Sequence, residues 1–252
     1  MSAGYVKHEI ADGIATVEFF HPASNSLPAA ILKQLGDAIS EMGTSEAVRV
    51  IILRSAGEKA FCAGASFDEL VAIEDAAGGL AFFSGFAHVI NAIRTCGKLV
   101  IGRVQGKAVG GGVGLASAVD YCLATTAAAV KLSELAVGIG PFVVGPAVAR
   151  KMGESAFSQL AIDATEWRTA DWAAKHGLYA EVHENTEGLD VAVNKLANRL
   201  AQSSPDAQAD LKRIFWEGTE DWDTMLTERA KVSGRLVLSD FTRNAIAAFK
   251  AK

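Results

Sequence analysis

One carboxylate stands in an otherwise apolar, glycine-bearing segment and is the first candidate for proton-transfer chemistry. Glu134 lies within residues 130–141, where most neighbours are aliphatic or small. Burial in such a segment raises the pKa of a carboxyl towards the range useful for general acid–base catalysis. A strand residue facing solvent is the alternative, and the residues of this segment alone leave both interpretations open.

Three consecutive glycines suggest a second kind of chemistry, the stabilisation of negative charge. Gly110, Gly111 and Gly112 stand between a predicted strand and an apolar helix, so their N–H groups would be free at the positive end of that helix. Close helix–sheet packing is the structural alternative. No Gly-Lys-Ser/Thr follows, and Leu115 stands where a dinucleotide fingerprint has its third glycine, which argues against both nucleotide motifs.

A loop of small residues, Ala63-Gly64-Ala65, would also expose backbone N–H groups to a ligand. Taken alone, such a loop is more typical of a tight strand-to-helix connection. Cys62 precedes it, and without a neighbouring base this thiol is better explained as a small buried side chain than as a nucleophile.

The elements that must position these groups follow from hydrophobic periodicity. A hairpin is predicted over residues 5–20 around Asp12-Gly13, and strands and helices then alternate as expected for an α/β fold with a mostly parallel sheet buried on both faces. Helices are predicted over 28–42, 67–73, 80–95 and 189–201, and strands over 48–53, 99–104 and 121–124. Residues 1–200 are assigned to the core and 201–252 to a C-terminal helical subregion.

Composition limits the classes of function. The net charge of −5 and the absence of a Lys/Arg run argue against a nucleic-acid partner. The three cysteines lack metal-ligand spacing, so neither a metal site nor a disulfide framework is expected, and a reducing, cytoplasmic location is. The start of the chain has no signal-like pattern, and the longest weakly polar run, 108–119, is too short to span a membrane.

Several other side chains are predicted to be structural. His88 is expected to be packed or partly exposed, and Trp167 and Trp172 to make core or subunit contacts. Lys212 and Arg213 could reach a ligand phosphate, but a solvated helix face is the favoured interpretation.

Taken together, the motifs resemble the crotonase, or enoyl-CoA hydratase/isomerase, superfamily over nearly the whole chain. The matching strings are His21-Pro22-Ala23-Ser24-Asn25-Ser26-Leu27, Ala63-Gly64-Ala65, Gly110-Gly111-Gly112, Asp120, and Ser133-Glu134 before Gly138-Ile139-Gly140-Pro141. The glycine-rich and Glu134 strings look most similar to bacterial methylglutaconyl-CoA-hydratase-like members.

The resemblance implies a crotonase-like core of stacked ββα units with a C-terminal helical trimerisation region, assembled as a homotrimer or homohexamer. It implies an acyl-CoA thioester substrate, with coenzyme A as part of that substrate and no separate cofactor. The N–H groups of Ala65 and Gly111 would form an oxyanion hole, and Glu134 would be the acid/base. The implied substrate-binding residues are Ala63, Phe67, Gly110, Ala23 and Ser24.

One position departs from the family pattern. Hydratases of this family usually carry a second glutamate two residues beyond the glycine triplet, where this chain has Gly114. Hydration of a 2-enoyl-CoA remains the favoured function. The alternatives are isomerisation of a 3-enoyl-CoA to a 2-enoyl-CoA with the single glutamate, and a non-catalytic acyl-CoA-binding protein.

Overall fold

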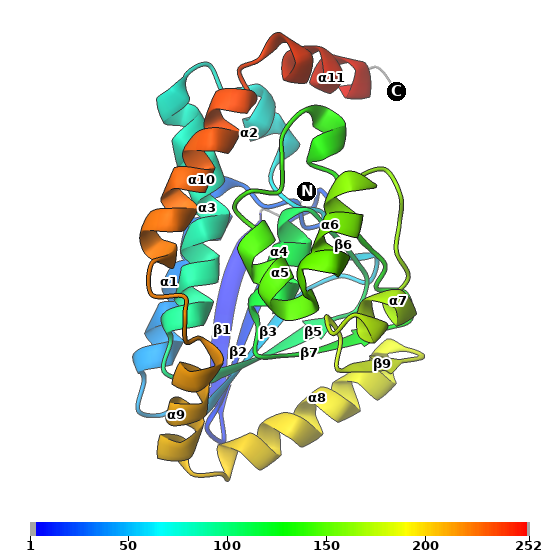
Figure 1. The fold of residues 1–252 in the computed structure, drawn as a ribbon. Helices are drawn as coiled ribbons and strands as arrows, with labels where there is room; N and C mark the ends of the chain where they lie inside the picture. Colours follow the sequence, from blue (N-terminus) through cyan, green and yellow to red (C-terminus); the bar gives the residue numbers. More distant parts are fainter. Residues whose placement is uncertain (1–3, 251–252) are drawn as a thin grey trace.

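The computed structural model describes residues 4–250 and contains a large and a small sheet (Figure 1). The large sheet is six-stranded in the order β1-β2-β3-β5-β7-β9, and only its β1–β2 pair is antiparallel. Its strands are β1 (Tyr5–Ala11), β2 (Ile14–Phe20), β3 (Val50–Ser55), β5 (Leu99–Val104), β7 (Tyr121–Thr125) and β9 (Glu181–His183). The predicted hairpin and mostly parallel sheet are confirmed.

Both faces of the large sheet are covered, because alternate side chains of its strands enter two different hydrophobic clusters. On β3, Ile51 and Leu53 join the main core, whereas Val50 and Ile52 pack with residues of α8 (Thr186–Ala201). This arrangement explains why the central strands read as continuous apolar runs rather than as alternating ones. Figure 1 shows α8 lying along one side of the sheet.

A small parallel sheet carries the segments of chemical interest and was not predicted. It has the order β4-β6-β8, with strands β4 (Ala60–Cys62), β6 (Lys107–Val109) and β8 (Val130–Lys131). Strands of two or three residues are too short to show a period in the sequence. Residues 107–109, for which the sequence predicts no strand, form the central strand of this sheet.

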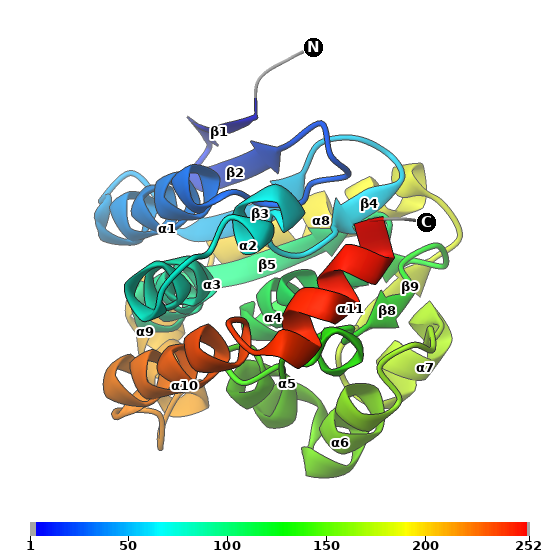
Figure 2. The same ribbon diagram turned by 90° about the horizontal axis from the view of Figure 1, so that it is seen from above.

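The helices surround the two sheets (Figures 1 and 2). Those before the C-terminal subregion, apart from α8, are α1 (Ala29–Thr44), α2 (Phe67–Val71), α3 (Ala76–Thr95), α4 (Gly111–Ala118), a 3-10 turn η1 (Leu135–Val137), α5 (Gly145–Met152), α6 (Glu154–Ile162) and α7 (Ala170–Lys175). α3 begins earlier than predicted because the Asp75 side chain accepts a hydrogen bond from Gly78 N at 2.7 Å and caps the helix.

The long helix α3 is, by length and composition alone, apolar enough to cross a membrane. It is a different segment from residues 108–119, the run that was judged from the sequence to be too short to span a membrane. In the fold α3 packs between α1 and α10 (Trp222–Leu236), and Phe86, Val89 and Ile90 enter the main core. At Gly79 a Cβ atom would lie 2.7 Å from Gly234 Cα, so α3 and α10 approach through two glycines.

The C-terminal subregion packs against the rest of the chain. It consists of α9 (Pro205–Phe215), α10 and α11 (Asp240–Lys250). Trp216, Trp222 and Leu226 belong to the same hydrophobic cluster as the sheet and α1. Lys212 is buried and its Nζ lies 2.6 Å from the equally buried Asp120 Oδ2, so the prediction of a solvated face was wrong for this residue, although Arg213 is exposed.

Candidate active site

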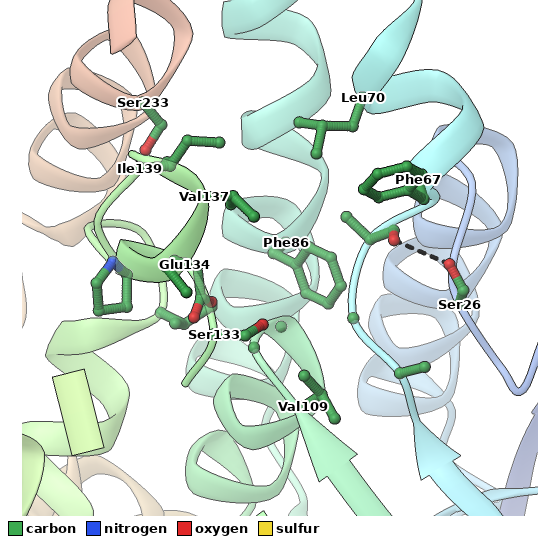
Figure 3. Close-up of a pocket in the computed structure, with 18 of the residues that line it drawn as sticks. Ser26, Phe67, Leu70, Phe86, Val109, Ser133, Glu134, Val137, Ile139 and Ser233 are labelled. Atoms are coloured by element: carbon green, nitrogen blue, oxygen red, sulfur yellow. Dashed lines mark hydrogen bonds between the residues drawn. The ribbon is translucent and has the colours of Figure 1, made fainter. Parts of the chain in front are cut away.

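A cavity of about 840 Å³ opens where the small sheet meets α3, α10 and α11. Aromatic and aliphatic side chains such as Phe67, Phe86 and Ile139 make up much of its wall, and Figure 3 shows them around Glu134. An apolar cavity with a few convergent polar groups is the usual form of a small-molecule site.

The loop at Ala65 presents one free backbone donor to the cavity. Leu27 and Ala65 form an isolated parallel bridge, whose hydrogen bonds use Gly64 O and Ser66 N rather than the N–H of Ala65. Ser26 Oγ donates to Ala65 O at 2.8 Å (Figure 3) and orients the following peptide plane. Within residues 4–250, no loop or side-chain acceptor receives the Ala65 N–H.

The glycine triplet supplies a second donor beside the first. A Cβ atom on Gly64 would lie 3.7 Å from Gly111 N, so the two loops are in contact. Gly111 is the first residue of α4, and its N–H therefore has no intrahelical acceptor. Gly110 has φ +52° and ψ −116°, a conformation that requires glycine. A Cβ on Gly111 would lie 2.2 Å from Phe86 Cζ, so any larger residue would require the Phe86 ring to move.

Glu134 stands next to these donors. A Cβ on Gly110 would lie 2.9 Å from Glu134 Oε1, so the carboxyl faces the start of α4 (Figure 3). Its Oε2 is buried and has no hydrogen-bond partner among the described residues. Burial raises the pKa of this carboxyl from 4.5 to about 7, and a hydrogen bond from its own backbone N–H opposes that rise. Glu134 can therefore both release and accept a proton near neutral pH.

The position of the missing second glutamate is closed. A Cβ atom on Gly114 would lie 2.6 Å from Val144 Cγ1 and 2.7 Å from Val144 Cβ. Gly114 is buried in α4, and Val144 occupies the room that a longer side chain would need. Within the described part of the cavity wall, the other carboxylate is Asp68, which is exposed at the start of α2.

The structure brings most of the predicted site residues together. Those that line the cavity are Ala23, Ala63, Ala65, Phe67, Gly110, Gly111 and Glu134. Ser24, predicted to bind substrate, does not line it; this residue is exposed and has a left-handed conformation, with φ +54°. The side chain of His88 lies outside the cavity and meets Asp37 at 3.2 Å. Burial raises the pKa of the Cys62 thiol to about 12, as expected for an inert core cysteine.

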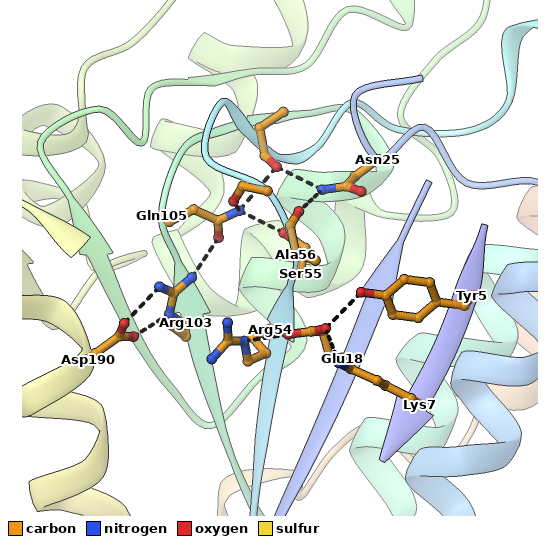
Figure 4. A network of polar contacts seen from close by, with 12 residues as sticks. Tyr5, Lys7, Glu18, Asn25, Arg54, Ser55, Ala56, Arg103, Gln105 and Asp190 are labelled. Carbon is orange, nitrogen blue, oxygen red and sulfur yellow. Dashed lines mark hydrogen bonds and ion pairs between the residues drawn. The ribbon is translucent and has the colours of Figure 1, made fainter. Parts of the chain in front are cut away.

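A polar network behind the cavity holds the loop that leads to Ala65 (Figure 4). Asn25 Nδ2 donates to Ala56 O at 2.8 Å and to Ala60 O at 3.0 Å. Gln105 Nε2 donates to Ser55 Oγ at 2.9 Å and also reaches Ala60 O at 3.2 Å. Asn25 was known from the sequence only as part of a family motif, and Gln105 was not singled out, because their partners are remote backbone carbonyls that no local spacing reveals.

Three further wall residues were also not predicted as site residues. His21 lines the cavity, and its Nδ1 is buried without a hydrogen-bond partner in the described chain. Lys131 and Trp167 line it as well, and Lys131 Nζ lies 4.6 Å from the centre of the Trp167 ring. The prediction that Trp167 packs in a core or subunit contact misses this exposure to the cavity.

Comparison with known proteins agrees with the site. The chain matches the Enoyl-CoA hydratase/isomerase family over residues 9–252. It is 30% identical over 242 residues to a short-chain-enoyl-CoA hydratase of Clostridium acetobutylicum, covering 95% of this chain and 92% of that protein. It is also 30% identical over 203 residues to a carnitinyl-CoA dehydratase of Proteus mirabilis, covering 77% of this chain and 73% of that protein.

Among solved structures, an enoyl-CoA hydratase from Bacillus halodurans superposes with a TM-score of 0.89. The superposition covers 97% of this chain and 99% of that one at 21% identity, and it supports the fold alone. The family match extends over almost the entire chain and includes every segment that lines the cavity. The protein therefore belongs to the enoyl-CoA hydratase/isomerase family.

Proposed function

We propose that this protein hydrates a 2-enoyl-CoA thioester through an enolate, with Glu134 as the acid/base and coenzyme A as part of the substrate. The observation that carries the proposal is the convergence of the Glu134 carboxyl, with its pKa raised to about 7, on the backbone donors of Ala65 and Gly111. Two fixed donors at a developing oxyanion are each worth roughly 10²–10³ in rate.

One glutamate can complete the hydration in two steps. Ionised Glu134 takes a proton from water as the hydroxyl oxygen bonds to the β-carbon, and the thioester carbonyl becomes an enolate oxygen held by the two N–H groups. Protonated Glu134 then gives its proton to the α-carbon, the carbonyl re-forms, and the carboxylate is regenerated. The raised pKa of Glu134, about 7, supports both proton transfers, and the short-chain-enoyl-CoA hydratase relative supports hydration as the reaction.

Isomerisation of a 3-enoyl-CoA is the second candidate, and the packing of Val144 on Gly114 favours it. That contact removes room for a second polar side chain beside the reacting carbons. In an isomerisation, Glu134 takes the α-proton and returns a proton to the γ-carbon, and no water enters. A single carboxyl titrating near neutral pH suits this shuttle.

A panel of matched 2-enoyl and 3-enoyl thioesters tests both candidates. We expect the wild type to consume a 2-enoyl thioester and release the 3-hydroxyacyl product. Glu134→Gln is expected to lose about 10²–10⁴ of this rate while still binding acyl-CoA. Double-bond migration without hydration would select the isomerase. Binding without turnover on either substrate would leave the non-catalytic acyl-CoA-binding alternative.

A further inference from the structure

Two lysine side chains converge on one tryptophan at the wall of the active-site cavity. Lys131 Nζ lies 4.6 Å and Lys107 Nζ 4.9 Å from the centre of the Trp167 ring. The backbone fixes this arrangement, because Val130 and Arg168 form an antiparallel bridge with both hydrogen bonds at 2.9 Å. In an antiparallel bridge the next residues along, Lys131 and Trp167, stand opposite each other.

The same sheet face connects these lysines with the reaction centre. Lys107 and Val109 are alternate residues of β6 and share a face, and Val109 is paired with Lys131 on β8. Val109 and Lys131 both line the cavity. Gly110 N donates to Lys131 O at 2.9 Å, so Lys131 lies one backbone hydrogen bond from the glycine triplet.

Among the described residues, the positive charge at this place has no ion-pair partner. Of the nearby acids, Asp163 is 2.6 Å from Arg168, Glu166 is exposed and makes no ion pair, and Glu134 faces Gly110. Lys131 at the cavity wall, with Lys107 beside the same tryptophan ring, thus forms a local site for an anion in a chain of net charge −5.

We propose that Lys131, supported by Lys107 and Trp167, binds a carboxylate at the far end of the acyl group, so that the preferred substrate is the monothioester of a dicarboxylic acid. This inference rests on the proposed acyl-CoA function. The backbone of Lys131 accepts a hydrogen bond from Gly110, the residue before the proposed oxyanion donor Gly111, whereas the coenzyme A phosphates lie beyond the long pantetheine arm. The anion within reach of Lys131 therefore belongs to the acyl group.

Equilibrium binding of two saturated thioesters tests the inference without requiring turnover. Glutaryl-CoA and pentanoyl-CoA have equal chain length and differ in the terminal carboxylate. We expect calorimetry to show tighter binding of glutaryl-CoA to the wild type. Lys131→Met should weaken glutaryl-CoA binding by about tenfold more than pentanoyl-CoA binding, as expected for the loss of a charged hydrogen bond. Lys107→Met should lower the same preference by a smaller factor.

Two further variants control for folding and for charge. Lys131→Arg keeps the positive charge and should retain the preference for glutaryl-CoA. Lys33→Met removes an exposed lysine that pairs with Asp37 outside the cavity, and it should leave the preference unchanged. Circular dichroism of each variant establishes that the fold is retained.

The other outcomes are equally distinct. Equal weakening of both thioesters by Lys131→Met would assign the lysine to a coenzyme A phosphate and overturn the proposal. An unchanged preference in that variant would overturn it too, since the lysine would then only pack on Trp167. Failure of the wild type to bind either thioester would count against the proposed function itself.

Discussion

At the scale of single residues, the chemistry of this site depends on one carboxyl group whose surroundings are almost entirely uncharged. Glu134 Oε2 is enclosed without a hydrogen-bond partner in the described chain, and this desolvation raises its pKa to about 7. The enclosed carboxylate lowers the stability of the folded state, and its raised pKa allows proton transfer near neutral pH. Both the reaction rate and the free energy of unfolding should therefore depend on pH.

The rate of the enzyme should depend on the ionisation of Glu134. Hydration begins with the carboxylate as base, so kcat/KM should be constant above about pH 7 and fall about tenfold per pH unit below it. A pH–rate profile with the preferred 2-enoyl thioester measures the pH at which kcat/KM begins to fall. A fall that begins only near pH 4.5, the ordinary pKa of a glutamate carboxyl, would contradict the enclosure of this carboxyl.

The same pKa predicts a pH-dependent stability difference. The pKa of Glu134 is raised in the folded state, so its contribution is most favourable below 4.5 and is lost as the pH rises through about 7. The difference corresponds to up to about 3 kcal/mol. Glu134→Gln should therefore gain stability relative to the wild type by up to this amount between about pH 4.5 and pH 8. Urea unfolding at both pH values measures it, and a constant gap would refute the prediction.

At the scale of elements, a buried charge cluster ties the C-terminal helices to the large sheet. Asp120 precedes β7, accepts from Val100 N on β5 at 2.7 Å, and lies 2.6 Å from Lys212 Nζ of α9. Trp216 Nε1 also donates to Asp120, at 3.1 Å. Asp120, known from the sequence only as part of a family motif, thus positions α9 and does not line the cavity.

Removing one charge of this buried cluster should be strongly destabilising, because its partner stays buried without a counter-charge. Lys212→Met leaves Asp120 buried without its cation, and the free energy of unfolding should fall by about 3–5 kcal/mol. The double variant Asp120→Asn/Lys212→Met should lose less than the sum of the two single losses. Arg213→Met, which removes an exposed ion pair with Asp210, is the control and should change stability by less than about 1 kcal/mol. Additive losses would show that the two buried charges act independently.

At the scale of the whole molecule, residues 201–252 complete a core that begins near the N-terminus. Trp216, Trp222 and Leu226 pack in one cluster with β2 and α1, and α10 packs along α3. α11 contributes Ala245 and Ala248 to the wall of the cavity. The C-terminal helical subregion is thus continuous with the hydrophobic core that positions the site.

Unfolding of the two parts should therefore be cooperative. Trp216 and Trp222 report on the C-terminal subregion, and Trp167 and Trp172 report on the segment around α7. In two variants, one of these pairs is replaced by Phe, so that tryptophan fluorescence reports on the pair that remains. In each variant, the denaturant midpoint from fluorescence should equal the midpoint from circular dichroism. An earlier transition seen by the Trp216/Trp222 pair alone would identify an independent C-terminal domain.

Local sequence patterns contain much of this protein's chemistry. An isolated glutamate in an apolar stretch, a glycine triplet before an apolar helix and a loop of small residues each left a structural alternative open. The resemblance to the crotonase superfamily joined Glu134, Gly111 and Ala65 into one predicted site. The long strands and helices were predictable from local patterns, since their periodicity extends over many neighbouring residues.

Tertiary structure alone decided the features that depend on residues far apart in the chain. The small sheet consists of strands too short to show a pattern, Val144 closes the space at Gly114 across thirty positions, and Lys212 becomes buried because Asp120 lies beneath α9. The pairing of Lys131 with Trp167 likewise needs the bridge between Val130 and Arg168. Such contacts depend on the packing of elements, and the spacing of residues along the sequence carries no record of them.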